Sequence, residues 1–316
     1  MLLCLGNAED IVLTYLILCL GLVGLFLGGD WLVKGASGIA LRFGVSPMVI
    51  GLTIVGFGTS TPELLVSLNA ALGGQPGIAI GNVIGSNIAN IMLILGIAAL
   101  ISPVTIAFAR IRRDLLWMTG AALILPIMFW SGSVGLLEGL LMVAALIVYL
   151  TLSLRGSGEV ELDIPVDVNL PLSIFLALLG LVAVMAGAHY LVQSASIIAR
   201  DFGVSEAMIG LSIVAIGTSL PELATTVMAV IRGQRDIAVG NVIGSNIFNV
   251  LGILGITALV TPIPLDPRFL KIDTPLVIAV TLGLFVMLWA TGKLNRITGA
   301  VMIAIYAAYI VLTGGL

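Results

Sequence analysis

Two copies of one sequence decide the fold of this chain: ASGIALRFGVSPMVIGLTIVGFGTSTPE at 36–63 and ASIIARDFGVSEAMIGLSIVAIGTSLPE at 195–222. The copies agree at 18 of 28 positions, with a constant offset of 159 residues. The same offset carries GNVIGSNI at 81–88 onto an identical GNVIGSNI at 240–247. Because one offset holds over both motifs, chance is excluded and the chain contains an internal duplication.

The composition places both copies in a membrane. Of 316 residues, 60% are apolar and only 9% are charged, and the mean hydropathy is +1.24. A soluble domain carries about 25% charged residues. Apolar runs recur from end to end, and the first ten residues lack a basic segment, so a cleaved leader before a soluble body is disfavoured. Cys4 and Cys19 support neither a disulfide framework nor a metal cluster, and no basic patch suggests nucleic acid.

Crossing a bilayer takes about 20 apolar residues. The sequence predicts ten such runs, at 11–33, 46–72, 78–103, 115–130, 134–154, 170–193, 205–231, 237–261, 274–291 and 297–315. The fourth is the shortest and contains Pro126. We therefore expect an all-α membrane protein of ten transmembrane helices. Two five-helix repeats, 1–154 and 170–316, would be joined by a linker at 155–169, with the duplicated motifs at 36–104 and 195–263.

The repeats are expected to be inverted. Five spans separate equivalent points, and because five is odd the two copies must cross the membrane in opposite directions. Inverted repeats of this kind are typical of secondary transporters, whose binding site lies near the bilayer midplane where the repeats meet. A channel could also be built from repeats, but inversion within one chain favours alternating access.

The thirteen Lys and Arg residues predict the orientation. Ten fall in loops on one side of the predicted topology and three on the other, which places the first side in the cytoplasm and both termini outside the cell. The linker at 155–169 is then cytoplasmic. Its acidic residues (Glu159, Glu161, Asp163 and Asp167) are interpreted as a solvated connection in preference to a regulatory ion site.

Glu63 and Glu222 are the candidate functional residues, because no other acid lies as deep in an apolar run; Asp30 and Glu138 lie nearer span ends. An ionisable group at that depth costs at least about 2.5–3.5 kcal/mol and is a candidate functional group by default. No Lys or Arg lies at a comparable depth to pair with either glutamate. Two acids without a base predict a bound cation.

The residues around each glutamate suggest how the cation is held. Thr59 precedes Glu63 by four residues, as Thr218 precedes Glu222, so each pair is expected on one helix face. Pro62 and Pro221 lack an N–H, so each helix should break there and free main-chain carbonyls.

The second motif adds neutral side chains. Ser86 and Asn90 are four residues apart, as are Ser245 and Asn249, and these short oxygen donors are expected near the site, with helix packing as the alternative. Packing is favoured for Asn82, Asn87, Asn241 and Asn246. His189, equivalent to Asp30, is expected in packing or in an entry vestibule.

Hard cations prefer oxygen ligands, and Ca²⁺ takes 6–8 of them. The absence of Cys and His from the candidate set argues against zinc or copper. Two carboxylates balance one Ca²⁺ or two Na⁺, so either load neutralises the site. The empty site, with two negative charges, should resist crossing, which predicts obligatory exchange. The chain is not expected to be an enzyme or to need a cofactor.

The paired motifs, GTS-x-PE at 58–63 and 217–222 with GNVIGSNI following each, resemble the two alpha-repeats of the cation/calcium antiporter family, and in particular its short archaeal and bacterial sodium/calcium exchangers. The similarity covers all ten expected spans. It implies Ca²⁺ ligands at Glu63, Glu222, Thr59 and Thr218. It implies Na⁺ ligands at Ser60, Ser219, Ser86, Ser245, the carbonyls of Gly56 and Ala215, and both glutamates. Asn90 and Asn249 would line the cavity, and sliding of the first and sixth spans would alternate access.

One position departs from the family pattern. Archaeal relatives can carry an aspartate where this chain has Asn249, which removes a third possible negative charge. Proton-coupled relatives usually carry GN-x-x-E-type motifs in place of GTS-x-PE, so Na⁺ is favoured over H⁺ or K⁺ as the counter-ion. A passive cation channel and an intramembrane hydrolase with an acid pair are the alternatives from other classes. The oligomeric state stays open.

Overall fold

The computed structural model describes residues 8–155, 168–204 and 215–314, and these residues are almost entirely helical. Their α-helices are α1 (Ala8–Phe43), α2 (Pro47–Ile50), α3 (Gly56–Thr59), α4 (Thr61–Leu72), α5 (Pro76–Ala89), α6 (Leu95–Ile101), α7 (Phe108–Met128), α8 (Leu136–Arg155), α9 (Leu170–Asp201), α11 (Ala215–Gly217), α12 (Leu220–Ile231), α13 (Arg235–Ile247), α14 (Gly255–Val260), α15 (Thr274–Thr291) and α16 (Arg296–Gly314). The π-helical segments are η1 (Gly51–Val55), η2 (Asn90–Ile94), η4 (Phe248–Leu254) and η5 (Phe269–Asp273). The expected linker at 155–169 lies almost wholly outside the described residues.

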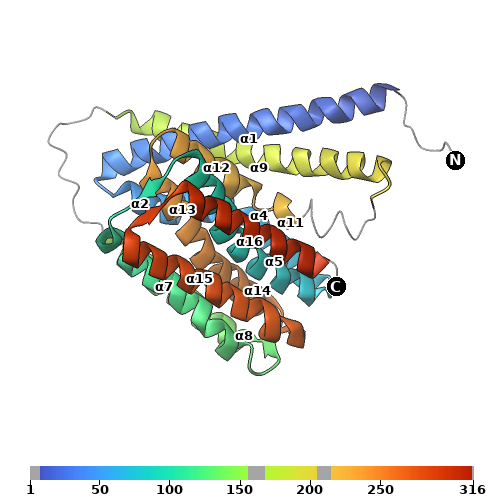
Figure 1. The fold of residues 1–316 in the computed structure, drawn as a ribbon, viewed down its shortest axis with the longest axis vertical. Coiled ribbons are helices and arrows are strands. Elements are labelled where there is room, and N and C mark those ends of the chain that lie inside the picture. The colour runs from blue at the N-terminus through green and yellow to red at the C-terminus, as the bar shows by residue number, and fades with distance from the viewer. Residues whose placement is uncertain (1–7, 156–167, 205–214, 315–316) are drawn as a thin grey trace.

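Helices α1 and α9 lie side by side and antiparallel, and the other helices form a slanted bundle against them (Figure 1). Glycines let the two backbones approach closely. A Cβ on Gly180 would lie 2.3 Å from the Leu32 main-chain nitrogen, and one on Gly35 would lie 2.4 Å from the Ala177 nitrogen. Small residues at helix contacts are a common means of close packing in membranes. These two helices therefore form one tightly packed pair.

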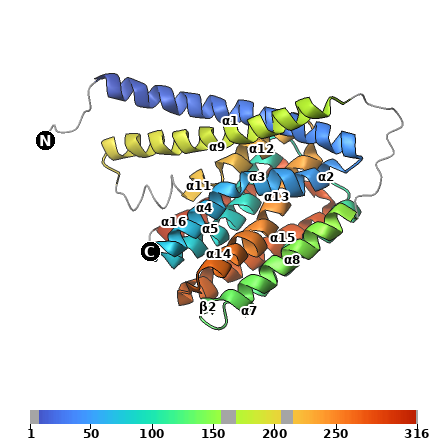
Figure 2. The same cartoon turned by 180° about the vertical axis from the view of Figure 1, so that it is seen from behind.

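Short strands fix the two ends of the bundle. Strand β1 (Val104–Thr105) pairs with β4 (Lys293–Leu294), and β2 (Ser133–Val134) pairs with β3 (Ile263–Pro264). Helix α7 connects β1 to β2, so the two strand pairs lie at opposite ends of this helix. We refer to these ends as the β1–β4 end and the β2–β3 end. The start of α1 and the end of α16 lie at the same end of the molecule in both views (Figures 1 and 2).

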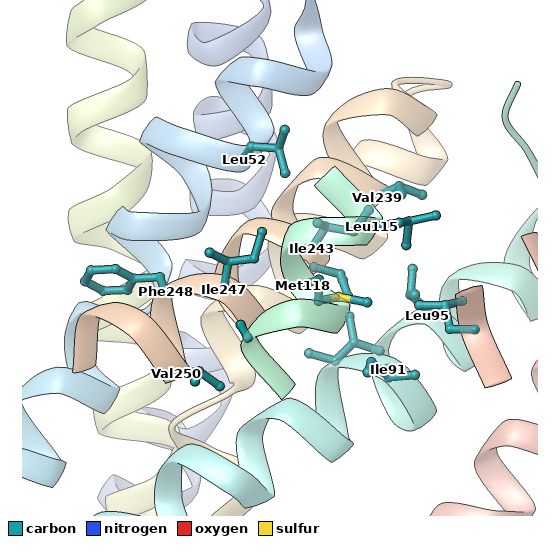
Figure 3. Close-up of a cluster of buried hydrophobic side chains, with 14 of the residues drawn as sticks. Leu52, Ile91, Leu95, Leu115, Met118, Val239, Ile243, Ile247, Phe248 and Val250 are labelled. Carbon is teal, nitrogen blue, oxygen red and sulfur yellow. The ribbon is translucent and has the colours of Figure 1, made fainter. Parts of the chain in front are cut away.

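The helices that carry the duplicated motif form the centre of the bundle. Apolar side chains from η1, η2, α6, α7, α13 and η4 converge there, among them Leu52, Ile91, Leu115 and Ile243 (Figure 3). Within the span Arg235–Val260, 89% of the residues in an apolar 18-residue window are buried. In the corresponding window of Ile11–Phe43, only 17% are buried. The motif helices are thus shielded by protein, whereas the first half of α1 exposes many of its side chains, as expected for contact with lipid.

Six helices of the described residues are long and apolar enough to cross a membrane, or seven if the bent pair Pro47–Thr59 and Thr61–Leu72 is one span. The six are Ile11–Phe43, Pro76–Ile101, Leu136–Arg155, Leu170–Asp201, Arg235–Val260 and Phe269–Thr291. Three further expected spans correspond to α7, to α12 and to α16. The first half of the expected span at 205–231 lies outside the described residues.

Three predicted boundaries were wrong in the same direction. Helices α1 and α9 continue to Phe43 and Asp201, beyond the expected ends at 33 and 193, and α7 begins at Phe108 and not at 115. Hydropathy marks the part of a helix that matches the hydrocarbon layer, whereas backbone hydrogen bonding continues into the polar interface. Pro126 does not interrupt α7, which ends two residues later.

Candidate functional site

The helix that carries Glu63 breaks where the sequence predicts. Helix α3 ends at Thr59, α4 begins at Thr61, and the two meet at 43°. The second copy has the same break, because α11 ends at Gly217 and α12 begins at Leu220. Pro62 and Pro221 occupy the first turn of the new helix, where a missing N–H costs nothing. Thr59 and Glu63 therefore lie on either side of a bend, and the expectation that they share one regular helix face was wrong.

Each break places its glutamate in the first turn of the following helix, and Glu63 and Glu222 are both only 1% exposed. A helix N-terminus favours negative charge. The Ser60 hydroxyl, in the first copy, donates to Glu222 Oε1 at 2.8 Å, so the carboxylate of one repeat lies against the turn of the other. Within the described part of the chain, both carboxylate oxygens of Glu63 and Oε2 of Glu222 are buried without a hydrogen-bond partner. The site thus holds acceptor oxygens that no protein donor satisfies.

The two glutamates are not the only buried acids. Asp30, Asp114 and Asp273 are also buried, but each of these aspartates lies against a base. Their ion pairs are Asp30–Lys34 (2.7 Å), Asp30–Arg232, Asp114–Arg113 (3.3 Å) and Asp273–Arg268 (3.7 Å). Among the ion pairs of the described residues, none involves Glu63 or Glu222. The missing base, and not burial alone, distinguishes the candidate site.

Two asparagines connect the repeats at the site. Asn82 donates to the Glu63 carbonyl at 3.1 Å and accepts from the Thr218 hydroxyl at 3.4 Å. Asn241, its equivalent, donates to the Glu222 carbonyl at 3.3 Å and accepts from the Thr59 hydroxyl, also at 3.3 Å. Each asparagine therefore joins the glutamate of its own repeat to the threonine of the other.

Assigning Asn82 and Asn241 to helix packing alone was too narrow. They contact both the glutamate and the threonine positions, and Asn82 also lines a cavity. Sequence reasoning missed this because the threonine partner of each lies in the other repeat. The signal available in the sequence was that each asparagine directly follows a glycine of the duplicated GNVIGSNI motif, 19 residues after its glutamate.

Several other predicted ligands also come together in pairs. The Ser219 hydroxyl donates to Ser86 Oγ at 3.3 Å, and the Ser245 hydroxyl donates to the Gly56 carbonyl at 3.4 Å. Ala215 begins α11, at the position equivalent to Gly56. The predicted serine and glycine ligands therefore contact one another across the two repeats.

The asparagines Asn90 and Asn249 lie deeper in the bundle, on π-helical segments. Asn90 begins η2, is buried, and its side-chain amide has no hydrogen-bond partner in the described residues. Asn249 donates to Asn87 Oδ1 at 3.0 Å. Single turns of π-helix often occur at functional sites. His189, by contrast, is exposed on α9, where its ring contacts that of Tyr190.

A cavity of about 500 Å³ connects this cluster to the β2–β3 end of the molecule. Its inner wall includes Asn82, Ser86 and Thr218, and its outer wall includes the exposed residues Asp266 and Arg268. An ion at the cluster could therefore exchange with water from this end.

The geometry and charge of the cluster suit a hard cation. Carboxylate, hydroxyl, amide and main-chain oxygens surround a site without a base, and such oxygens are the ligands that Ca²⁺ and Na⁺ prefer. Where the structure describes the chain, no group of three or more His, Cys, Asp or Glu side chains is placed to hold a metal ion. Neutral oxygens would therefore have to supply most of the ligands beyond the two carboxylates.

Comparison with known proteins agrees with this chemistry. The profile of the sodium/calcium exchanger protein family matches residues 13–155 and 172–315, which are nearly the two repeats. The putative antiporter CaxA of Alkalimonas amylolytica is 38% identical over 92% of this chain and 95% of its own. The sodium/calcium exchanger MaX1 of Methanosarcina acetivorans is 35% identical over 95% of this chain and 98% of its own.

A solved structure gives the same result. The sodium–calcium exchanger NCX_Mj, soaked with 2.5 mM Na⁺ and 0.1 mM Ca²⁺, superposes with a TM-score of 0.85 at 32% identity, covering 95% of this chain and 98% of that one. The all-helical membrane fold is therefore shared along nearly the full length of both chains. The chain belongs to the sodium/calcium exchanger protein family.

Proposed function

We propose that this chain exchanges Na⁺ for Ca²⁺ across the cell membrane, binding both ions between Glu63 and Glu222. The observation that carries the proposal is the pair of buried carboxylates, one per repeat, with three oxygens that have no hydrogen-bond partner and with no basic partner among the described residues. A buried charge that no protein group compensates is costly. A cation in the site removes that cost, so the protein is suited to binding Ca²⁺ or Na⁺ there. Membership of an exchanger family supports the same reading.

The Ca²⁺ ligands of the proposal are Glu63, Glu222, Thr59 and Thr218. Ser60, Ser86, Ser219, Ser245 and the carbonyls of Gly56 and Ala215 would hold Na⁺ together with the glutamates, and Asn90 and Asn249 would line the middle of the site. The contacts Ser60–Glu222, Ser219–Ser86 and Ser245–Gly56 support this set because they join residues of different repeats. Asn82 and Asn241 position the two glutamate turns.

Exchange follows from the charge of the site. Two carboxylates are neutralised by one Ca²⁺ or by two Na⁺, so either loaded form can be buried during the transition. The empty form keeps two negative charges and is disfavoured in the occluded, dehydrated state. The protein should therefore change the side of access only with ions bound, which is the requirement for antiport. No bond of a substrate is broken, so the activity is transport and not enzymatic.

Alternating access would use ten spans arranged as two inverted five-helix repeats, 1–154 and 170–316. The reciprocal contacts of Asn82 and Asn241 support a pseudo-two-fold relation between the repeats, because Asn82 contacts Thr218 of the second repeat and Asn241 contacts the equivalent Thr59 of the first. The β1–β4 end would face the cytoplasm together with the 155–169 linker, and both termini would be extracellular. The cavity at the β2–β3 end would then be the extracellular access path, with α1 and α9 sliding against the bundle to close it.

Flux measurements in proteoliposomes test the proposal. Vesicles loaded with Na⁺ and diluted into Na⁺-free buffer should take up radiolabelled Ca²⁺, and vesicles loaded with K⁺ should not. Glu222→Gln should abolish the uptake. Glu138→Gln is the matched control, because this glutamate lies at the start of α8, away from the cluster, and accepts a hydrogen bond from the Gly135 amide in its own turn. Uptake driven equally by a pH step or by K⁺ would overturn Na⁺ coupling, and downhill Ca²⁺ flux without a counter-ion would indicate a channel.

A further inference from the structure

A buried aspartate lies on the wall of the access cavity, apart from the proposed ion ligands. Asp273 ends η5 at the start of α15 and is only 4% exposed. It lines the same cavity as Asn82, Ser86 and Thr218. An ion that approaches Asn82, Ser86 and Thr218 through this cavity therefore passes the Asp273 carboxylate.

Asp273 is held by one base and one phenol. Its Oδ2 lies 3.7 Å from Arg268 Nε, and its Oδ1 accepts from the Tyr309 hydroxyl at 3.3 Å. The Arg268 side chain is 44% exposed at the cavity mouth, so it can leave the aspartate without being dehydrated. Asp266, Asp273 and Arg268 are the charged residues of the described cavity wall. Displacement of the arginine by an entering cation would leave two acids facing the cavity.

The duplication supplies a counterpart at the other end. Asp273 is offset by 159 residues from Asp114, which lies two turns into α7 near the β1–β4 end. Asp114 is also buried and also paired with an arginine, Arg113, at 3.3 Å. The two arginines are not at equivalent positions, so each repeat pairs its aspartate with a base from a different position. The two repeats thus have a buried aspartate beside an arginine at equivalent positions near opposite ends, in addition to the pair of Asp30 with Arg232.

We propose that Asp273 receives cations entering from the β2–β3 end, with Arg268 as its resting counter-charge. This inference rests on the proposed exchange of Na⁺ for Ca²⁺. The carboxylate raises the local cation concentration in a narrow cavity with low-dielectric walls, which speeds ion entry. Arg268 competes with the ion for the carboxylate and so sets how strongly the cavity attracts it. Asp273 therefore attracts the ion before the ion reaches the proposed ligands, and it is not itself one of those ligands.

The test measures the half-saturating Ca²⁺ concentration separately on each membrane face, in right-side-out and inside-out vesicles with a fixed Na⁺ gradient. Asp273→Asn should raise it on one face only, by about three- to tenfold, as expected for one unit charge acting on a divalent ion across a hydrated cavity. Asp114→Asn, which neutralises the equivalent buried aspartate of the other repeat, should leave it unchanged on that face. Arg268→Gln should lower it on the face that Asp273→Asn affects.

A purely structural ion pair would behave differently. Loss of either partner would then reduce the maximal rate on both faces, and Arg268→Gln would share the sign of Asp273→Asn. Either result overturns the inference while wild-type exchange remains intact. Absence of Na⁺-dependent Ca²⁺ flux in the wild type would instead reject the proposed function itself. If Asp273→Asn does not fold, Arg268→Gln carries the test alone, and an unchanged or raised half-saturating concentration overturns the inference.

Discussion

Replacing Glu222 with glutamine removes one of two buried negative charges and keeps the size of the side chain. Two unit charges about 4 Å apart interact by about 4 kcal/mol at an effective dielectric constant of 20, and a divalent ion doubles that value. The carbonyl oxygen of the glutamine can still coordinate the ion, which offsets part of the loss. We expect Ca²⁺ binding to weaken by at least about 4 kcal/mol, which is about a thousandfold.

The same substitution should stabilise the ion-free protein. Glu222 Oε2 is buried without a hydrogen-bond partner among the described residues, and leaving a buried group unsatisfied costs about 1–3 kcal/mol, or more for a charged group. The neutral amide lowers that cost. The ion-free variant should therefore unfold at a higher temperature than the ion-free wild type, while Ca²⁺ should no longer raise its melting temperature.

Thermal unfolding in detergent, with a chelator and with a Ca²⁺ series, measures both effects on one sample. Wild-type protein should gain about 2.7 kcal/mol of stability at a Ca²⁺ concentration a hundred times its dissociation constant. Glu138→Gln should gain as much as the wild type. A Glu222→Gln variant that is stabilised by Ca²⁺ like the wild type, or that is less stable than the wild type without ions, would refute the assignment of Glu222 to the ion site.

Three further substitutions test individual contacts at the site and elsewhere in the bundle. Asn82→Ala should lower the Ca²⁺ transport rate and destabilise the protein by about 1–3 kcal/mol, because the buried Glu63 carbonyl loses its hydrogen-bond donor. Asn295→Ala, at the exposed start of α16, should leave transport unchanged in the same flux assay. Gly180→Ala should lower the melting temperature by several degrees, since its Cβ would meet main-chain atoms of α1, while Gly283→Ala, which meets nothing within 4 Å, should leave it unchanged or raise it. Asp30→Asn should destabilise the protein by only about 1–2 kcal/mol in denaturant unfolding, because both of its bases are nearly half exposed.

The sequence predicts the helix breaks and the burial of the two glutamates well because the relevant signals are local. Pro62 beside Glu63 predicts a helix break, and the break lies there. A lone acid in an apolar run predicts a missing counter-charge, and Glu63 has no basic partner in the described residues. The duplication adds that each of these features occurs twice. None of these inferences requires knowledge of which helices are neighbours.

The errors concern contacts between distant parts of the chain. The role of Asn241 depends on Thr59, which lies 182 residues away, and no local pattern reports that distance. Asp273 was overlooked because it lies at the edge of an apolar run near Arg268 and Lys271, where a charged cluster is normally solvated. Its burial depends on the packing of Tyr309 from α16. Sequence periodicity predicts which residues face the interior of the protein, but it does not predict which residues of other helices they contact.

The close approach of α1 and α9 restricts how the protein can move. Because main-chain atoms of one helix occupy the space where Cβ atoms of the other would be, relative translation of the two helices must overcome steric barriers along the whole contact, whereas translation of both together meets none of them. The two helices are therefore expected to move together as one rigid unit. A ligand or lipid that immobilises either helix would immobilise both.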